Sequence, residues 1–166
     1  MVLDRVNKIA YACISPRTDV EVLVRWCSMM DYTSFTFVAR YDGQEIYHTN
    51  VMMAIADKYA VVCLESIRDE DKRNEVIHSL ENSGKEIIEI SFDQVLQFAG
   101  NMLQVEGSGG QKYMVMSERA YNSLSKEQIN AIEMYDKILS IPINNIEKYG
   151  GGSVRCMMAE VFLPKK

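Results

Sequence analysis

Apolar and polar positions along the chain follow two periods, one typical of strands and the other of helices. Short apolar runs bounded by polar residues and glycine predict strands over 8–15, 33–39, 50–55, 58–65, 86–90, 101–105 and 112–116. Apolar residues at helical spacing predict helices over 19–30 and 69–80, and Gly84 is placed to cap the second. The pattern therefore predicts a protein in which strands and helices alternate.

Turn and capping residues place the remaining boundaries. Tyr41-Asp42-Gly43-Gln44 and the glycine-rich segment 107–110 predict turns, the latter closing a hairpin. A further helix is predicted to begin at Ser117. Ser125 and Gln128 have the spacing of a capping box, which predicts a helix that ends before Pro142. The segment 155–163 is apolar and predicts strand structure at the end of the chain.

The order of these elements repeats at an interval of about fifty residues. Weak similarities link 7–13 with 57–63, and 49–53 with both 100–103 and 154–158. A strand–strand–helix–strand unit cannot cover its own apolar face, so such units stack on one another or surround an axis. The repeat predicts an α/β fold of about three ββαβ units with mixed sheets plus a final strand pair, forming one domain over residues 1–166. In this register Met1 falls within the first strand of a unit.

Composition excludes several classes of protein. The 166 residues are 48% hydrophobic and 25% charged, which suits one globular domain with a core of its own. The net charge of −5 and the absence of clustered Lys and Arg argue against a nucleic-acid partner. No apolar stretch is long enough to span a membrane, and no secretory signal opens the chain. We therefore expect a soluble, cytoplasmic protein.

The cysteines and methionines indicate one unusual position. The four cysteines lie too far apart for a metal or redox motif, so we expect no metal ion and no cofactor. Cys13, Cys27 and Cys63 lie in apolar runs and are interpreted as core residues. Methionines at strand positions, including the pair 157–158, are interpreted in the same way. Cys156 differs because it follows the glycine run 150–152.

Cys156 and His48 occupy equivalent loops of the repeat, each leading into a unit. If the units surround an axis, these loops converge at one end, and the two side chains can meet. A cysteine with a histidine elsewhere in the sequence is a candidate nucleophile–base pair, because the thiolate is the reactive form. Arg155 or a protonated His48 would favour that thiolate. His78 lies on a charged helix and is interpreted as solvated.

These residues also carry a resemblance to a known family. The run Gly-Gly-Gly-Ser-Val-Arg-Cys-Met over 150–157 resembles the C-terminal nucleophile loop of arginine deiminases and related guanidine-modifying enzymes, the pentein superfamily. With 47–53, 98–102 and 156–164, the similarity extends over essentially all of the chain. Over this length the chain is similar to the later units of the bacterial amidinotransferase-like group that includes citrulline-utilisation hydrolases. Penteins have five ββαβ units in a propeller, and the resemblance implies that this chain holds the later units.

The resemblance implies a role for each candidate residue. Cys156 is the nucleophile that attacks a guanidinium or ureido carbon, and His48 is the acid–base that protonates the departing amine. Asn50 and Asn101 line the pocket, and Arg155 and Gly152 complete the substrate-binding set. The implied partner is a small guanidino or ureido compound, with water or an acceptor amine completing the reaction. Open sheet edges predict a homodimer or association with further units.

Two departures from the family pattern leave alternatives open. Arginine deiminases have an acidic residue two positions after the histidine, where this chain has Asn50. The family's loop with a substrate-gripping carboxylate would precede Met1, so the chain by itself is expected to be a poor enzyme. The main alternative is a non-catalytic pentein-like interaction module or a degenerate fragment. A papain-like thiol hydrolase fits less well, because its cysteine comes early in the chain.

Overall fold

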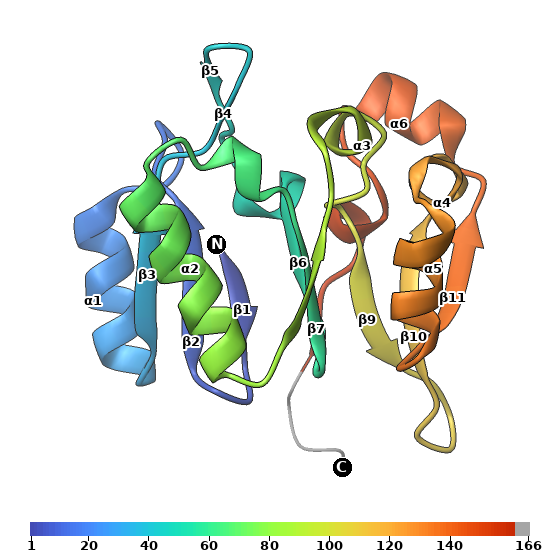
Figure 1. The fold of residues 1–166 in the computed structure, drawn as a ribbon, viewed down its shortest axis with the longest axis horizontal. Coiled ribbons are helices and arrows are strands. Elements are labelled where there is room, and N and C mark those ends of the chain that lie inside the picture. The colour runs from blue at the N-terminus through green and yellow to red at the C-terminus, as the bar shows by residue number, and fades with distance from the viewer. Residues whose placement is uncertain (162–166) are drawn as a thin grey trace.

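Three ββαβ units stand side by side in the computed structural model, which describes residues 1–161 (Figure 1). The first unit, drawn in blue, consists of β1 (Val2–Asp4), β2 (Ile9–Cys13), α1 (Val20–Met30) and β3 (Thr33–Phe37). The second consists of β6 (Met53–Ile55), β7 (Tyr59–Val62), α2 (Glu70–Asn82) and β8 (Glu86–Glu89). The third consists of β9 (Leu103–Glu106), β10 (Lys112–Ser117), α4 (Glu118–Ser123), α5 (Lys126–Glu133) and β11 (Lys137–Ile141).

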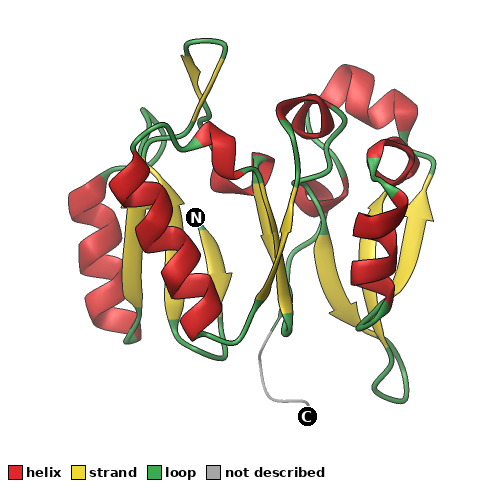
Figure 2. Cartoon of the chain, in the orientation of Figure 1, coloured by secondary structure: helices red, strands yellow, loops and turns green. Residues whose placement is uncertain are grey.

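Each unit forms a separate mixed sheet of three strands (Figure 2). The first strand pairs antiparallel with the second, and the third returns parallel to the second after the helix. The small hairpin of β4 (Arg40–Tyr41) and β5 (Gln44–Glu45) projects beside the first two units. None of these sheets closes on itself within the described residues. The predicted mixed α/β fold built from repeated ββαβ units is therefore confirmed.

Local sequence signals explain where the helices begin and end. The carboxylates of Asp19 and Asp69 accept hydrogen bonds from the first turns of α1 and α2. Ser125 and Gln128 form the predicted capping box of α5. Gly84 has a left-handed φ of 74° just after α2, which suits a residue without a Cβ.

Helices fill the spaces between neighbouring sheets. α2 packs on β8 of its own sheet and on β3 of the first unit, whereas α5 contacts both β11 and β8. One apolar cluster therefore runs through all three units, and it contains the buried methionines 52, 53, 102, 114 and 116. α1 covers the outer face of the first sheet, where Leu23 and Cys27 are buried. No helix in the described part of the chain is both long and apolar enough to cross a membrane.

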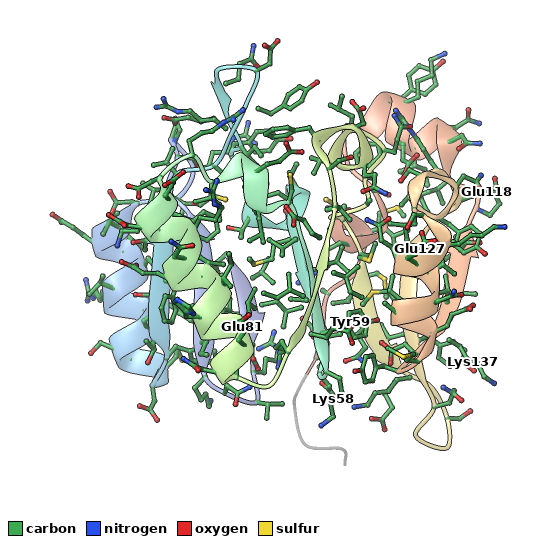
Figure 3. The ribbon with its side chains drawn as sticks, viewed as in Figure 1. Lys58, Tyr59, Glu81, Glu118, Glu127 and Lys137 are labelled. Carbon is green, nitrogen blue, oxygen red and sulfur yellow. The ribbon has the colours of Figure 1, made fainter. Side chains whose placement is uncertain are left out.

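A chain of buried polar side chains joins the units near the end of β6. The Lys85 ammonium lies 2.8 Å from the Asp4 carboxylate, and only 1% and 2% of these side chains are exposed. The Lys85 ammonium also donates to the carbonyl oxygen of Asp57. The backbone N–H of Asp57 donates in turn to Oε1 of Gln104. Gln104 Nε2 donates in turn to Asp136, which accepts a 2.7 Å hydrogen bond from the Tyr59 hydroxyl. Figure 3 shows Tyr59 between the second and third units.

Several predicted boundaries are wrong, most of them near the end of the chain. The segment 50–55 begins as the 3₁₀ helix η1 (Thr49–Val51), and η2 (Leu64–Ser66) follows β7. α3 (Phe92–Leu96), β11 and α6 (Asn144–Gly150) were not predicted. The predicted final strand pair is absent from the described residues: Cys156 lies in η3 (Val154–Met157), and no strand follows up to residue 161. Residues 162 and 163 of that prediction lie outside the described range.

The interpretation of the sulfur-containing residues holds except at the pair 157–158, where Met158 is only half-buried and belongs to neither core cluster. Cys13, Cys27 and Cys63 are buried, and Cys156 is exposed. Met157 is 50% exposed and is not a core residue. It is exposed because η3 turns the chain where a strand would have placed alternate side chains in the core. His78 is exposed on α2, as expected of a solvated side chain.

Candidate active site

Cys156 lies in a short turn that the glycine run leads into. Gly151 ends α6 with a left-handed φ of 66°. A Cβ added at Gly152 would come within 3.1 Å of both Cβ and Sγ of Cys156. That distance is tighter than ordinary van der Waals contact, so the absence of a side chain at Gly152 leaves room for the sulfur. The buried side chain of Val154 anchors the turn in the protein.

Asn101 is held by a close approach of two backbones. The residue is 2% exposed and follows Gly100, where an added Cβ would lie 2.4 Å from the carbonyl oxygen of Val51. Only glycine permits this approach, and it packs the loop before β9 against η1 before β6. Phe98 begins this segment with a left-handed φ of 66°. The loop that carries Asn101 is thus fixed against the loop that carries His48 and Asn50.

The side-chain amide of Asn101 links two of these loops. Its Nδ2 donates to the carbonyl oxygen of Asn50 at 3.0 Å and to Sγ of Cys156 at 3.3 Å. The structure therefore brings together three of the sequence-predicted site residues, Asn50, Asn101 and Cys156, with Gly152 beside the sulfur. These residues come from the loops before β6 and β9 and from η3. The amide N–H thereby fixes the position of the sulfur between these loops.

His48 is exposed at the start of η1, next to Thr49. The buried hydroxyl of Thr49 accepts a hydrogen bond from the N–H of Cys13 at 2.9 Å, which ties this loop to the end of β2. The edge of the His48 ring meets Tyr47, with 4.8 Å between the ring centroids. No hydrogen bond joins His48 to Cys156 within residues 1–161.

Arg17 is a residue of this site that the sequence analysis missed. Its guanidinium stacks over the Tyr47 ring at 4.8 Å. Partial desolvation and then the positive charge of Arg17 lower the pKa of His48 below its usual range. The imidazole is consequently neutral near pH 7 and able to accept a proton. The sequence showed only an arginine in the turn after a predicted strand. Such an arginine cannot be told from one that is simply solvated.

Arg155 faces away from the sulfur. Its guanidinium donates to the carbonyl oxygen of Met158 at 3.0 Å and lies 3.5 Å from the Glu160 carboxylate. Arg155 and Asn50 both line a cavity of about 610 Å³ between β1, β6 and β9, but neither His48 nor Cys156 lines it. Arg155 therefore lines the cavity, and no hydrogen bond joins its guanidinium to Cys156 within residues 1–161.

The four cysteines differ in burial and in the groups that surround their sulfur atoms. Burial raises the pKa of Cys13 to about 12 and that of Cys63 to about 11, so both stay protonated at neutral pH. Burial also raises the pKa of Cys27. Cys156 is the exposed cysteine and the one with an amide donor on its sulfur. Among the described residues no group of three or more His, Cys, Asp or Glu side chains could hold a metal ion.

A family model decides the relationship. The model for N,N dimethylarginine dimethylhydrolase, eukaryotic, matches residues 1–163. The chain belongs to the dimethylarginine dimethylhydrolase family. The predicted resemblance to guanidine-modifying enzymes is thereby confirmed at the level of this family. No curated protein matches the sequence.

Several solved structures share the fold of this chain. ArgZ, an arginine dihydrolase from the ornithine–ammonia cycle in cyanobacteria, superimposes in its apo form with a TM-score of 0.76 at 15% identity, over 98% of this chain and 24% of ArgZ. The substrate-bound N-terminal domain of ArgZ gives a TM-score of 0.68 at 17% identity over 93% of this chain. AgrE with ornithine and NAD⁺ gives 0.74 at 17% identity, over 99% of this chain and 22% of AgrE. The chain spans about half the length of the ArgZ N-terminal domain, 52% of it being covered.

Proposed function

We propose that this chain carries the nucleophile of a guanidine- or ureido-group hydrolase or amidinotransferase, with Cys156 as nucleophile and His48 as acid–base. The observation that carries the proposal is the Asn101 amide, which holds the Cys156 sulfur at 3.3 Å and the Asn50 carbonyl at 3.0 Å. This contact places the one exposed cysteine beside the loop of the histidine. Membership of the dimethylarginine dimethylhydrolase family supports the same chemistry.

The reaction begins when neutral His48 takes up the proton of the Cys156 thiol, and the resulting thiolate attacks the central carbon of the guanidinium or ureido group and forms a C–S bond. The C–N bond to the departing amine then breaks, and the amine leaves with a proton from protonated His48. Neutral His48 next takes a proton from water, whose oxygen attacks the same carbon. The C–S bond breaks and the thiolate is restored. In a transferase, an acceptor amine replaces the water.

Asn50 and Arg17 define the proposed substrate. A neutral Asn50 stands at the position where arginine deiminases have an acidic residue, which would favour a cationic guanidinium. Citrulline-like ureido groups and substituted guanidines are therefore included, in keeping with the citrulline-utilisation group. The Arg17 guanidinium beside His48 is placed to pair with the carboxylate of an amino-acid substrate.

The units are proposed to complete a propeller by association. In the described sheets β1, β6 and β9 each pair with one strand only, and all three line the cavity. α1 also exposes Val22 and Met29, at 68% and 75%. A homodimer, or a complex with further ββαβ units, would cover these surfaces. Light scattering during size-exclusion chromatography measures the mass, and a monomer at all concentrations contradicts the homodimer.

The test of the catalytic assignment is the alkylation of the four cysteines by 2-chloroacetamidine and by iodoacetamide. The amidine resembles a guanidinium, whereas iodoacetamide is neutral. We expect Cys156 to react with the amidine at least about tenfold faster than Cys13, Cys27 or Cys63, since the thiolate is the reactive form. Peptide mass spectrometry identifies the modified residue. Cys156→Ala should remove the fast reaction, and His48→Asn should slow it.

A panel of guanidino and ureido compounds then defines the substrate. Arginine, N-methylated arginines, citrulline and agmatine are incubated with the protein, and the released ammonia or amine is measured. Turnover that disappears in Cys156→Ala supports an enzyme. If Cys156 reacts no faster than the buried cysteines and none of the compounds is turned over, the non-catalytic interaction module replaces the present proposal.

A further inference from the structure

A buried carboxylate lies directly behind the nucleophile turn. Glu147, on α6, is 4% exposed, and its Oε1 accepts a hydrogen bond from the hydroxyl of Ser153 at 2.6 Å. That separation lies at the short end of the range for hydrogen bonds between two oxygens. Oε2 of Glu147 is buried without a hydrogen-bond partner among the described residues. Burial of a carboxylate with one partner is unfavourable, so its presence here points to a function of that one contact.

Ser153 differs from the other serines that precede helices. The hydroxyls of Ser91, Ser117 and Ser125 accept hydrogen bonds from backbone N–H groups in the first turns of α3, α4 and α5. Ser153 precedes η3 in the same way, but its hydroxyl makes no such cap and donates to Glu147. Its carbonyl oxygen accepts the N–H of Cys156 at 3.0 Å. One residue thus connects the carboxylate on α6 to the backbone of the nucleophile.

The glycine run makes this connection necessary. Gly150, Gly151 and Gly152 separate α6 from Ser153, and glycines lose the most backbone freedom on ordering. The buried Val154 holds η3 against the protein. The contact of Ser153 with Glu147 supplies a second anchor. With both in place, the sulfur is held at the Asn101 amide.

We propose that Glu147 and Ser153 form a latch that positions Cys156, so that Glu147 is a positioning residue for the nucleophile. This inference rests on the proposed function only in its consequence for reactivity. The latch acts on the turn itself, and its effect on backbone motion is independent of any substrate.

The test compares Ser153→Ala and Glu147→Ala with Ser153→Thr, which keeps the hydroxyl. Ser125→Ala is the matched control, because it removes a serine before α5 away from the site. Inactivation by 2-chloroacetamidine gives kinact and KI. In both alanine variants we expect kinact to fall about 10- to 100-fold, the effect of losing a hydrogen bond to a charged group, with KI changed less than about threefold. Ser153→Thr should recover most of kinact, and Ser125→Ala should leave it unchanged.

Hydrogen exchange of the backbone amides at 150–157 is the second measurement. We expect faster exchange in this segment in the two alanine variants, with Ser125→Ala like the unaltered protein. If Ser153→Ala and Glu147→Ala exchange at the original rate and keep kinact within about twofold, the latch is rejected. If exchange increases but the unaltered protein shows no preference for the amidine, the latch is supported and the proposed function is rejected.

Discussion

Two clusters of polar side chains join the units on either side of β6, and they differ in charge and in access to solvent. After β6, Asp4 and Lys85 form an ion pair with at most 2% of either side chain exposed. Before β6, the cluster of Asn50, Asn101 and Cys156 has no ion pair, and its cysteine is exposed. The charged cluster holds the units in register. The neutral cluster leaves a sulfur open to a molecule from outside.

The difference shows how one fold separates stability from reactivity. A fully buried ion pair holds its two partners together, because either charge left alone in the interior is very unfavourable. A similar pair at Cys156 would compete with a charged substrate for the thiolate. An amide is neutral and still donates to the sulfur, so Asn101 orients Cys156 without neutralising it.

The largest effect is expected from breaking the charged cluster with Lys85→Met. Asp4 would remain buried without its cation, so the free energy of unfolding should fall by about 3–5 kcal/mol. Urea titration measures this loss. Asp4→Leu added to Lys85→Met removes the stranded charge and should restore part of the stability. A single variant as stable as the unaltered protein would contradict the assigned role of the ion pair.

The same cluster predicts a dependence on pH. Burial alone would raise the pKa of Asp4, but the hydrogen bonds from Lys85 and Asn7 outweigh it and place the pKa below its usual value. The unfolded chain therefore binds the proton at higher pH than the folded protein does. The stability that Asp4 contributes is complete above the unfolded pKa of about 3.9 and is lost as the pH falls through the lower folded value. Urea titrations in this acid range should show a weaker dependence on pH in Lys85→Met.

An intermediate effect is expected from Asn101→Ala at the neutral cluster. The Cys156 sulfur loses its donor, and the alkylation of Cys156 by 2-chloroacetamidine should slow by about 10- to 100-fold. Gln104→Ala is the matched control, because it removes a half-buried amide from the charged cluster. It should lower the free energy of unfolding and leave the alkylation rate unchanged. Equal alkylation rates in the two variants would contradict the conclusion that only the neutral cluster affects the reactivity of Cys156.

The smallest effect is expected from Arg17→Gln. Removing this cation raises the pKa of His48 toward its usual value, because the positive charge disfavours the imidazolium. The acid limb of the pH profile for Cys156 alkylation should then move to higher pH, with a rate lowered by less than about threefold at pH 6. NMR titration of the imidazole measures the shift directly, and His78→Gln removes the signal of the second histidine. An unchanged His48 titration would show that Arg17 does not act on it.

Local sequence signals predicted the elements that depend on nearby residues. The capping box of Ser125 and Gln128 and the strand pattern at Tyr59–Val62 are examples. The prediction of strand structure over 155–163 was wrong for a physical reason. Apolar residues after Cys156 have strand-like composition, but Val154 and Ser153 are buried and turn the chain into η3. Strand formation needs a neighbouring strand, and composition does not reveal whether one is present.

The residues of the candidate site likewise divide into those that the sequence indicated and those that it did not. The repeat indicated Cys156 and His48 as candidate residues, because they lie in equivalent loops and such loops are expected to converge. Arg17 and Glu147 were missed, since their importance depends on partners that fold beside them: Arg17 acts through its position next to His48, and Glu147 through its burial under Ser153. A glutamate among polar residues in a short helix has the sequence character of a solvated side chain.

The contact between Glu147 and Ser153 lies within the same short segment as Cys156, from 147 to 156. The backbone support of the sulfur is therefore inherited as a unit, whereas Arg17 and Asn50 come from distant parts of the gene. Mutations in those distant parts alter which molecule reaches the sulfur and leave its support intact. Ligand specificity and the geometry at Cys156 should consequently diverge at different rates among members of the family.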